Sequence, residues 1–401
     1  MSFEAAGLEH SRSEYLRLTL GVEEEYLVVD PVTRVVVPDG PEVARRAAVE
    51  LGEAVGTEIT RFQVEARTPP CTDLDELRQA IGRMRAVVID AAASLDRRII
   101  ASGTPVLGNV VPPMISDHPR YRQSLLAYRA LDDEQTICAC HIHVGIADRG
   151  QAVQVSNHLR PHLPVLIALM ANSPFWDGRD SGYASWRTLA CGRWPVAGAP
   201  PYFPSLAHYE GLVSTLLETE VLLDRGSIYW DIRPSSHVPT LEIRAADVPT
   251  LLDDTILLAA LVRALVVVAL ASIKRGEPAP QPAPELLRAA YWRAARDGMD
   301  GNGIDVQNAS RLTPAVTLAQ RLVEHAHPGL GHGGDYELVI TGLHRLIATG
   351  GGAARQRAVF TRSGSLADVV DHLIEQTEPA TAPQLPLSGG KDSPTSPSPM
   401  I

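Results

Sequence analysis

Cysteine is scarce in this chain, and long uninterrupted hydrophobic runs are missing. Four cysteines in 401 residues are too few for the disulfide framework of a small secreted protein, and nothing resembling a signal peptide precedes them. The longest apolar run extends from Ile256 to Ser272, but Arg263 interrupts it, and it falls short of the roughly 18–20 apolar residues that span a bilayer. We therefore expect a buried helix there, no membrane partner and a cytoplasmic location.

Aromatic residues are also sparse, at 5% of the chain, so a core must consist mainly of Ala, Val, Leu and Ile. A basic excess is absent as well. The formal net charge of −11 argues against nucleic acid as a partner, because nucleic acid selects a basic face. The acidic balance still permits an ATP site, since bound metal ions can supply the positive field there.

The two ends of the sequence differ from its interior. Residues 1–13 show no hydrophobic period and are expected to form a loose lead-in, whereas the Pro- and Ser-rich residues 378–401 are expected to be a disordered tail. Between them, residues 14–377 are expected to fold as a single domain. Their composition is that of a globular protein, because 45% of the chain is hydrophobic and 21% is charged.

Hydrophobic spacing predicts both strands and helices within this domain. Expected strands cover residues 17–29, 35–37 and 99–103. Expected helices cover residues 74–95 (capped by Thr72 and Asp73), 151–169 (broken or kinked by Pro161 and Pro164), 212–224, 250–273 and 285–297. This irregular alternation predicts an α+β fold with one sheet backed by helices.

Paired carboxylates occur on the first expected strand. Side chains alternate along a strand, so Glu23 and Glu25 share one face while Glu24 points to the other. Two carboxylates side by side repel each other unless a cation lies between them, and Mg²⁺ takes such oxygen ligands. A solvated polar face explains the same pattern, so this motif alone decides nothing.

A second acidic motif lies between residues 58 and 67. Gln63, Glu65 and Arg67 share a face if they form a strand ending before Pro69. Glu58 precedes Glu65 by seven residues, an odd spacing that places the two on opposite faces of a regular strand. Both can serve one site only if a bulge or turn intervenes, and a surface strand with salt bridges would explain the motif equally well.

Potential zinc ligands occur together in Cys138-Ala-Cys140-His141-Ile-His143. Alternation opposes a zinc site, because His141 and His143 share one face while Cys138 and Cys140 share the other. We expect the cysteines to be small core residues and the two histidines to face the glutamates.

Arginines accompany a further carboxylate in the next expected strands. Glu242 and Arg244 share a face, and Arg233 lies on a strand just upstream. Guanidinium groups that keep their charge beside a metal ligand suit phosphoryl transfer, although a salt-bridge ladder would use the same residues.

Two loops complete the candidates. Asn172 to Asp180, continuing to Arg187, is rich in turn residues, aromatics and arginines, as ligand-binding loops are, although an ordinary connection has the same composition. The glycines at 350–352 lack the lysine of a phosphate loop, so we expect a hinge or a helix start there.

Taken in order, these motifs resemble one family over about residues 17–376. The segments Gly-Val-Glu-Glu-Glu-Tyr, Gln-Val-Glu, His-Ile-His-Val-Gly, Ala-Asn-Ser-Pro-Phe-Trp-Asp-Gly-Arg-Asp and Pro-Thr-Leu-Glu-Ile-Arg are similar to those of the bacterial carboxylate–amine ligases called glutamate–cysteine ligase type 2. The resemblance implies a glutamine-synthetase-like catalytic domain in which a curved antiparallel sheet lines the active site. Ala139 and Cys140 depart from the Gly-Leu that is frequent in the family.

The resemblance also implies roles for individual residues. The implied metal ligands are Glu23, His141 and Glu242 for one ion, and Glu25, Glu58 and Glu65 for another. The implied catalytic residues are Arg233 and Arg244, which would hold phosphate groups, and the implied substrate-binding residues are His143, Asn172, Arg179 and Arg187.

The implied reaction joins a carboxylate to an amine with ATP and Mg²⁺ or Mn²⁺, through an acyl phosphate. Glutamate and cysteine are the expected substrates, although a different amine is equally compatible with the motifs. The residues also leave open a phosphotransferase of related fold, a metal-binding protein without catalysis and a zinc hydrolase. A homodimer is a further expectation.

Overall fold

The computed structural model describes residues 18–108, 110–308, 310–331 and 334–378. The lead-in expected at residues 1–13 and nearly all of the tail expected at 378–401 lie outside the described residues. Within them, one large hydrophobic cluster draws on residues from Leu20 to Leu373, so the described chain shares a core from end to end.

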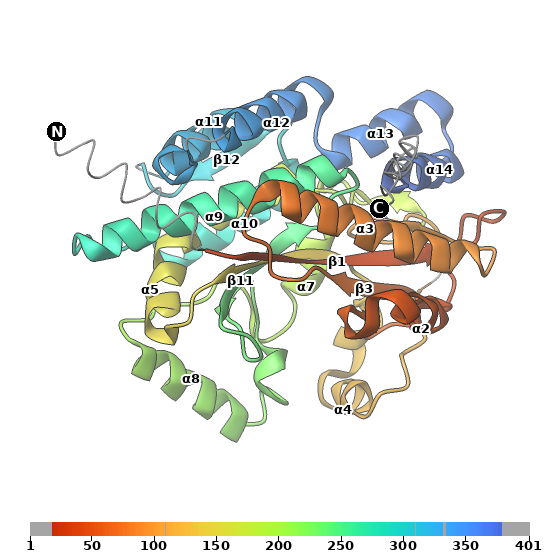
Figure 1. Ribbon diagram of the computed structural model, residues 1–401, viewed down its shortest axis with the longest axis horizontal. Helices are drawn as coiled ribbons and strands as arrows, with labels where there is room; N and C mark the ends of the chain where they lie inside the picture. Colours follow the sequence, from red (N-terminus) through yellow and green to blue (C-terminus); the bar gives the residue numbers. More distant parts are fainter. Residues whose placement is uncertain (1–17, 109, 309, 332–333, 379–401) are drawn as a thin grey trace, which may run out of the picture.

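A seven-stranded sheet is the centre of the molecule (Figure 1). Its strands follow the order β10-β11-β5-β1-β3-β2, and β4 also pairs with β1. All of these pairings are antiparallel. The strands of this sheet are β1 (Leu20–Val29), β2 (Val55–Thr57), β3 (Gln63–Arg67), β4 (Arg98–Ile100), β5 (Ala139–Gly145), β10 (Ile232–Pro234) and β11 (Thr240–Asp247).

Short two-stranded pairs form the remaining described strands. They are β6 (Phe175–Trp176) with β7 (Arg179–Asp180), β8 (Ala197–Gly198) with β9 (Tyr229–Trp230), and β12 (Asn302–Asp305) with β13 (Arg311–Pro314). The pair β8–β9 is parallel, and the other two are antiparallel.

Helices enclose the sheet on both sides. They are α2 (Gly40–Leu51), α3 (Leu74–Ala93), α4 (Pro119–Tyr128), α5 (Arg149–Leu159), α6 (Leu163–Met170), α7 (Trp186–Cys191), α8 (Leu206–Glu218), α9 (Leu252–Lys274), α10 (Pro284–Asp297), α11 (Ala315–Ala326), α12 (Asp335–Thr349), α13 (Gly352–Ser363) and α14 (Leu366–Thr377). In Figure 1, α3 and α9 lie on one side of β1, and α4 and α8 lie on the other. The predicted α+β fold with one antiparallel sheet backed by helices is therefore confirmed.

Helix α9 is the long apolar segment of the sequence. It is long and apolar enough to cross a membrane by length and composition, but 78% of its most apolar window is buried inside the protein. It packs against β5, α3 and α12. It is therefore a core helix, as the sequence predicted.

Several predicted boundaries differ from the structure. The helix expected at residues 212–224 is α8, which begins at Leu206 because the Ser205 side chain caps it by accepting a hydrogen bond from the His208 amide. The extended run expected at 35–37 contributes only a single bridge between Val29 and Val36. The strand expected at 99–103 ends at Ile100.

Other predicted features are present. Asp73 caps α3, and the helix expected at 151–169 is divided into α5 and α6 by a short 3₁₀ turn at Arg160–His162, which contains Pro161, while Pro164 is the second residue of α6. Gly352 is the first residue of helix α13 and Gly351 is its N-cap, so the expected helix start is present.

Glu24 links strand β1 to the helices that cover one face of the sheet. It points away from Glu23 and Glu25, into the layer formed by α3 and α9, and is fully buried. Arg85 donates two hydrogen bonds to its carboxylate, at 2.6 and 2.8 Å, and Thr255 and Tyr26 donate one each, at 2.6 and 2.5 Å. This buried ion pair holds β1 against the helices and leaves the neighbouring glutamates facing the other way.

Candidate active site

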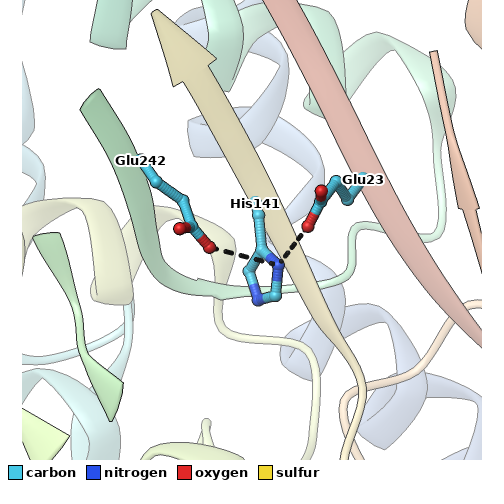
Figure 2. A group of neighbouring side chains, drawn as sticks. All are labelled: Glu23, His141 and Glu242. Atoms are coloured by element: carbon cyan, nitrogen blue, oxygen red, sulfur yellow. Dashed lines mark hydrogen bonds and ion pairs between the residues drawn. The ribbon is translucent and has the colours of Figure 1, made fainter. Parts of the chain in front are cut away.

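Three adjacent strands present the first cluster of polar side chains. Glu23 on β1, His141 on β5 and Glu242 on β11 project from the same face of the sheet and converge (Figure 2). Glu23 stands opposite His141 in the β1–β5 register, and its Oε2 lies 3.0 Å from His141 Nδ1. Glu242 Oε1 lies 3.9 Å from the same nitrogen. One potential ligand atom from each residue lies within 4.8 Å of the others.

A second cluster lies beside it on the same face. Glu25 stands opposite Glu65 in the β1–β3 register, and together with Glu58 they bring three carboxylates within 4.8 Å of one another. The sequence spacing of Glu58 and Glu65 required an irregular strand. The structure supplies a turn: β2 ends at Thr57, β3 begins at Gln63, and Glu58 lies just after the end of β2.

The second cluster has a strongly perturbed protonation equilibrium. Burial and the neighbouring Glu65 raise the pKa of Glu25 to about 7. Burial and Glu25 likewise raise the pKa of Glu58 to about 7, and burial and Glu58 raise the pKa of Glu65 well above its usual range. Three carboxylates close together therefore favour protonation although Arg67 Nε lies 3.5 Å from Glu65 Oε1, and a divalent cation would remove this cost.

Two arginines bind the carboxylate of the first cluster. Arg233 Nε donates to Glu242 Oε2 at 2.8 Å, and Arg244 Nη1 donates to Glu242 Oε1. Burial alone would raise the pKa of Glu242, but Arg244 and Arg233 outweigh it and lower that pKa. Both guanidinium groups thus lie directly beside a potential metal ligand.

His141 lies between the two clusters. Its Nδ1 is shared by Glu23 and Arg244, and its Nε2 lies 3.7 Å from Glu25 Oε1. Burial and the positive charge of Arg244 lower the pKa of His141 to about 4, so the imidazole is neutral near pH 7. A neutral imidazole nitrogen is the form that binds metal.

His143 faces a cavity. Its Nδ1 lies 2.8 Å from Thr240 Oγ1 and its Nε2 lies 3.3 Å from Glu23 Oε1. Burial lowers its pKa, but the hydrogen bond with Glu23 and the charge of Glu242 reverse this, so the pKa is raised overall. The cavity has a volume of about 430 Å³ and includes, among its lining groups, Glu23, Arg67, His143, Arg233, Thr240 and Glu242.

The residues present fit divalent metal ions. Each cluster offers three potential ligands, and carboxylates with one neutral imidazole suit Mg²⁺ or Mn²⁺. His141 Nε2 is one of the buried side-chain atoms of the described residues that have no hydrogen-bond partner. Buried polar atoms of this kind are usually satisfied by protein, water or a bound group.

The three other residues predicted to bind substrate lie elsewhere. The Asn172 amide is buried and donates to Ala101, Val248 and Thr250 at 2.8 to 3.0 Å. Arg179 is exposed on the short strand β7. Arg187 on α7 is buried and donates to the Arg244 carbonyl oxygen at 3.0 Å, so it alone of the three adjoins the two clusters.

The cysteines occupy the core, as the sequence predicted. Cys138 and Cys140 are fully buried, and burial raises the pKa of both thiols well above the usual range. Neither belongs to a described cluster of three potential metal ligands. Sequence reasoning missed Thr240 beside His143, although strand alternation places Thr240 on the same face as Glu242. It also missed Tyr121 on α4, whose hydroxyl donates to the Thr57 carbonyl next to Glu58.

Proteins of known family resemble this chain along almost its whole length. Residues 19–372 match the family model for glutamate-cysteine ligase family 2. A relative from Mycolicibacterium smegmatis that carries the name glutamate–cysteine ligase 2-3 is 44% identical over 360 residues, which cover 90% of this chain and 98% of the relative. A relative from Saccharopolyspora erythraea with the name glutamate–cysteine ligase 2-1 is 42% identical over 371 residues, covering 92% and 98%.

Solved structures share the fold. The glutamate–cysteine ligase of Francisella tularensis, crystallised in complex with AMP, matches with a TM-score of 0.66 at 13% identity, covering 92% of this chain and 90% of that one. A bifunctional glutathione synthetase from Pasteurella multocida matches with a TM-score of 0.69 at 15% identity, covering 92% of this chain and 53% of that one. These structures confirm the ligase fold that the sequence resemblance implied. From the family match and the identity to its members, the chain belongs to glutamate-cysteine ligase family 2.

Proposed function

We propose that this protein is an ATP-dependent carboxylate–amine ligase that activates its acid as an acyl phosphate at a two-cation centre on the sheet. The observation that carries the proposal is the pair of three-ligand clusters on one strand face, with Arg233 and Arg244 bonded to Glu242. Family membership supports the ligase activity and the use of ATP. The names of the relatives favour glutamate and cysteine as substrates.

Different residues of the chain would bind the cations and the phosphate groups. Glu23, His141 and Glu242 would hold one divalent cation, and Glu25, Glu58 and Glu65 the other. When bound, such cations neutralise phosphate charge and orient the reacting oxygens. Arg233 and Arg244 keep their positive charge at every physiological pH and would hold phosphate oxygens in the transition state.

The reaction balances in two steps. A carboxylate oxygen attacks the γ-phosphorus of ATP, the bond from phosphorus to the bridging oxygen breaks, and ADP leaves. The nitrogen of a neutral amine then attacks the acyl carbonyl carbon, phosphate leaves with the former carboxylate oxygen, and the nitrogen loses a proton to give the amide. His143, beside the cavity of about 430 Å³, would contact the substrate.

The proposal is tested by product analysis with purified protein, ATP, Mg²⁺ and glutamate. We expect ADP and inorganic phosphate to appear in equal amounts only when an amine is added, together with an amide found by mass spectrometry. Hydroxylamine serves as a small amine that traps an acyl phosphate as a hydroxamate. A phosphorylated acid or amine without release of phosphate would instead identify a phosphotransferase, and absence of ATP turnover with every acid tried would refute the proposal.

A further inference from the structure

A large cavity lies outside the two clusters, next to helix α7. It has a volume of about 770 Å³, which is within the range of roughly 300–1,000 Å³ typical of small-molecule sites. Much of its wall is apolar and comes from three separate segments. These are residues 197–202, residues 281–284, and helix α10 with Leu287, Tyr291 and Trp292.

Two buried arginine side chains, Arg160 and Arg187, line this cavity. Among the described residues, Arg160 Nη1 and Arg187 Nε have no hydrogen-bond partner, although their residues are only 3% and 5% exposed. Native proteins seldom leave such atoms unpaired. Two arginine side chains in a largely apolar cavity favour a ligand that carries an anionic group.

The two arginines are held in place by their other nitrogens. Arg160 Nε donates to the Pro200 carbonyl at 2.6 Å, and Arg187 Nη2 donates to the Arg244 carbonyl at 3.0 Å. The backbone therefore holds each guanidinium group in place, and Arg187 Nη1 also lies 3.9 Å from the buried carboxylate of Asp247. A planar guanidinium fixed in this way suits a carboxylate.

One carboxylate lies in the same wall. Asp231 is 6% exposed, and its backbone carbonyl accepts a hydrogen bond from the Arg244 amide at 2.7 Å. Tyr291 lines the same cavity. An acid in a wall that also contains two guanidinium groups complements a zwitterion, whose ammonium pairs with the acid and whose carboxylate pairs with an arginine.

The cavity adjoins the metal-binding face. Arg187 lines the cavity and also contacts the backbone of Arg244, whose side chain bonds to Glu242. A ligand in the cavity would thus lie beside Arg187, one residue away from the Arg244 backbone.

We propose that this cavity binds the amine substrate and that this substrate is an α-amino acid with a bulky apolar side chain. Its carboxylate pairs with Arg160 or Arg187, its ammonium group pairs with Asp231, and its side chain lies against the apolar wall. This inference rests on the proposed function, and it extends that function from cysteine to larger amino acids.

Calorimetry with L-phenylalanine tests the site without relying on activity. We expect the full chain to bind L-phenylalanine and to bind phenethylamine, which lacks the carboxylate, more weakly by about tenfold or more. Leu287→Trp fills the cavity and is expected to weaken binding of L-phenylalanine by a similar factor. Leu286→Trp is the matched control, because Leu286 is the exposed neighbour on α10 and does not line the cavity.

Asp231→Asn tests the ammonium partner, and it is expected to weaken binding of L-phenylalanine more than binding of 3-phenylpropionate, which lacks the ammonium group. Equal binding by the Leu287→Trp and Leu286→Trp variants, or no binding of L-phenylalanine at all, would overturn the proposal. Hydroxamate formation by the unmodified enzyme with hydroxylamine, which needs no bulky amine, reports the ligase chemistry separately. Failure of the cavity inference is therefore distinguishable from failure of the proposed function.

Discussion

Glu23 and His141 face each other across strands β1 and β5, with Glu23 Oε2 at 3.0 Å from His141 Nδ1. Each also contacts a second group of the site, because Glu23 reaches His143 and His141 reaches Glu242 and Arg244. The pair therefore joins the predicted ligands of one cation to the arginines predicted to hold phosphate.

Replacing either member of this pair should abolish metal-dependent ATP turnover without unfolding the protein. We expect Glu23→Gln or His141→Ala to lower the rate by about 100-fold or more, the size of effect seen when one electrostatic stabiliser is removed. Turnover is measured as ADP release, and folding by circular dichroism. Full activity in either variant would contradict the assignment of the first cluster.

The carboxylates Glu25, Glu58 and Glu65 predict how the metal-free protein responds to pH. The folded-state pKa of Glu58 is about 7, above its ordinary value of 4.5, so the folded state favours the protonated form. Stability from this group is present at low pH and is lost as the pH rises through about 7. In EDTA, we expect Tm to fall between pH 5 and pH 8 by more than in Mg²⁺.

Glu58→Gln isolates the contribution of this cluster. The amide cannot ionise, so the variant should lose less stability between pH 5 and pH 8 in EDTA and should gain less from Mg²⁺. Glu324→Gln, which changes an exposed glutamate on α11, is the control and should behave as the unmodified protein does. Parallel Tm curves for the three proteins in EDTA would refute the clustering of the acids.

The buried pair of Glu24 and Arg85 predicts a large loss of stability. Arg85→Met leaves the Glu24 carboxylate buried without its cation, and such changes cost about 3–5 kcal/mol. Urea unfolding measures the cost. Arg78→Ala, which removes the arginine of a partly exposed pair with Asp253, should cost about 1 kcal/mol or less. The double change Glu24→Gln with Arg85→Met should recover part of the loss.

Asn172 should contribute mainly to stability. The sequence predicted a substrate-binding role, but the structure gives the amide group partners within the protein, with Ala101, Val248 and Thr250 accepting from its nitrogen and Gln356 donating to its oxygen. Asn172→Ala leaves buried groups unpaired and should lower the free energy of unfolding by about 1–3 kcal/mol.

Kinetics distinguish the two roles of Asn172. If the residue is structural, the KM for the amino-acid substrates should stay nearly unchanged at a temperature where the variant is folded. Asn302→Ala, at an exposed position, is the control for stability. A large rise in KM with unchanged stability would restore the substrate-binding role.

Most of what could be predicted about the site from the sequence came from the alternation of side chains along strands. It placed Glu23 with Glu25 and His141 with His143 on one face, and the structure agrees, because a side-chain period of two follows from the backbone alone. The position of Glu58 was harder to predict. No glycine or proline marks the turn between β2 and β3, so only the folded backbone reveals it.

Contacts between residues far apart in the chain could not be predicted from the sequence. Glu24 meets Arg85 and Thr255 only because two helices far apart in the chain cover the same face of the sheet. The cavity wall that contains Arg160, Asp231 and Tyr291 is likewise built from segments far apart in the chain. Local periodicity cannot specify such contacts, since it contains no information about which elements pack together.

Glu24 lies between two residues that would each bind a different cation, and its side chain is bonded through the back of the sheet to helix α3. Rotating β1 about its own axis would break that bond and would move Glu23 and Glu25 together. A substitution on α3, remote from every substrate, is therefore expected to change the spacing of both cation sites at once.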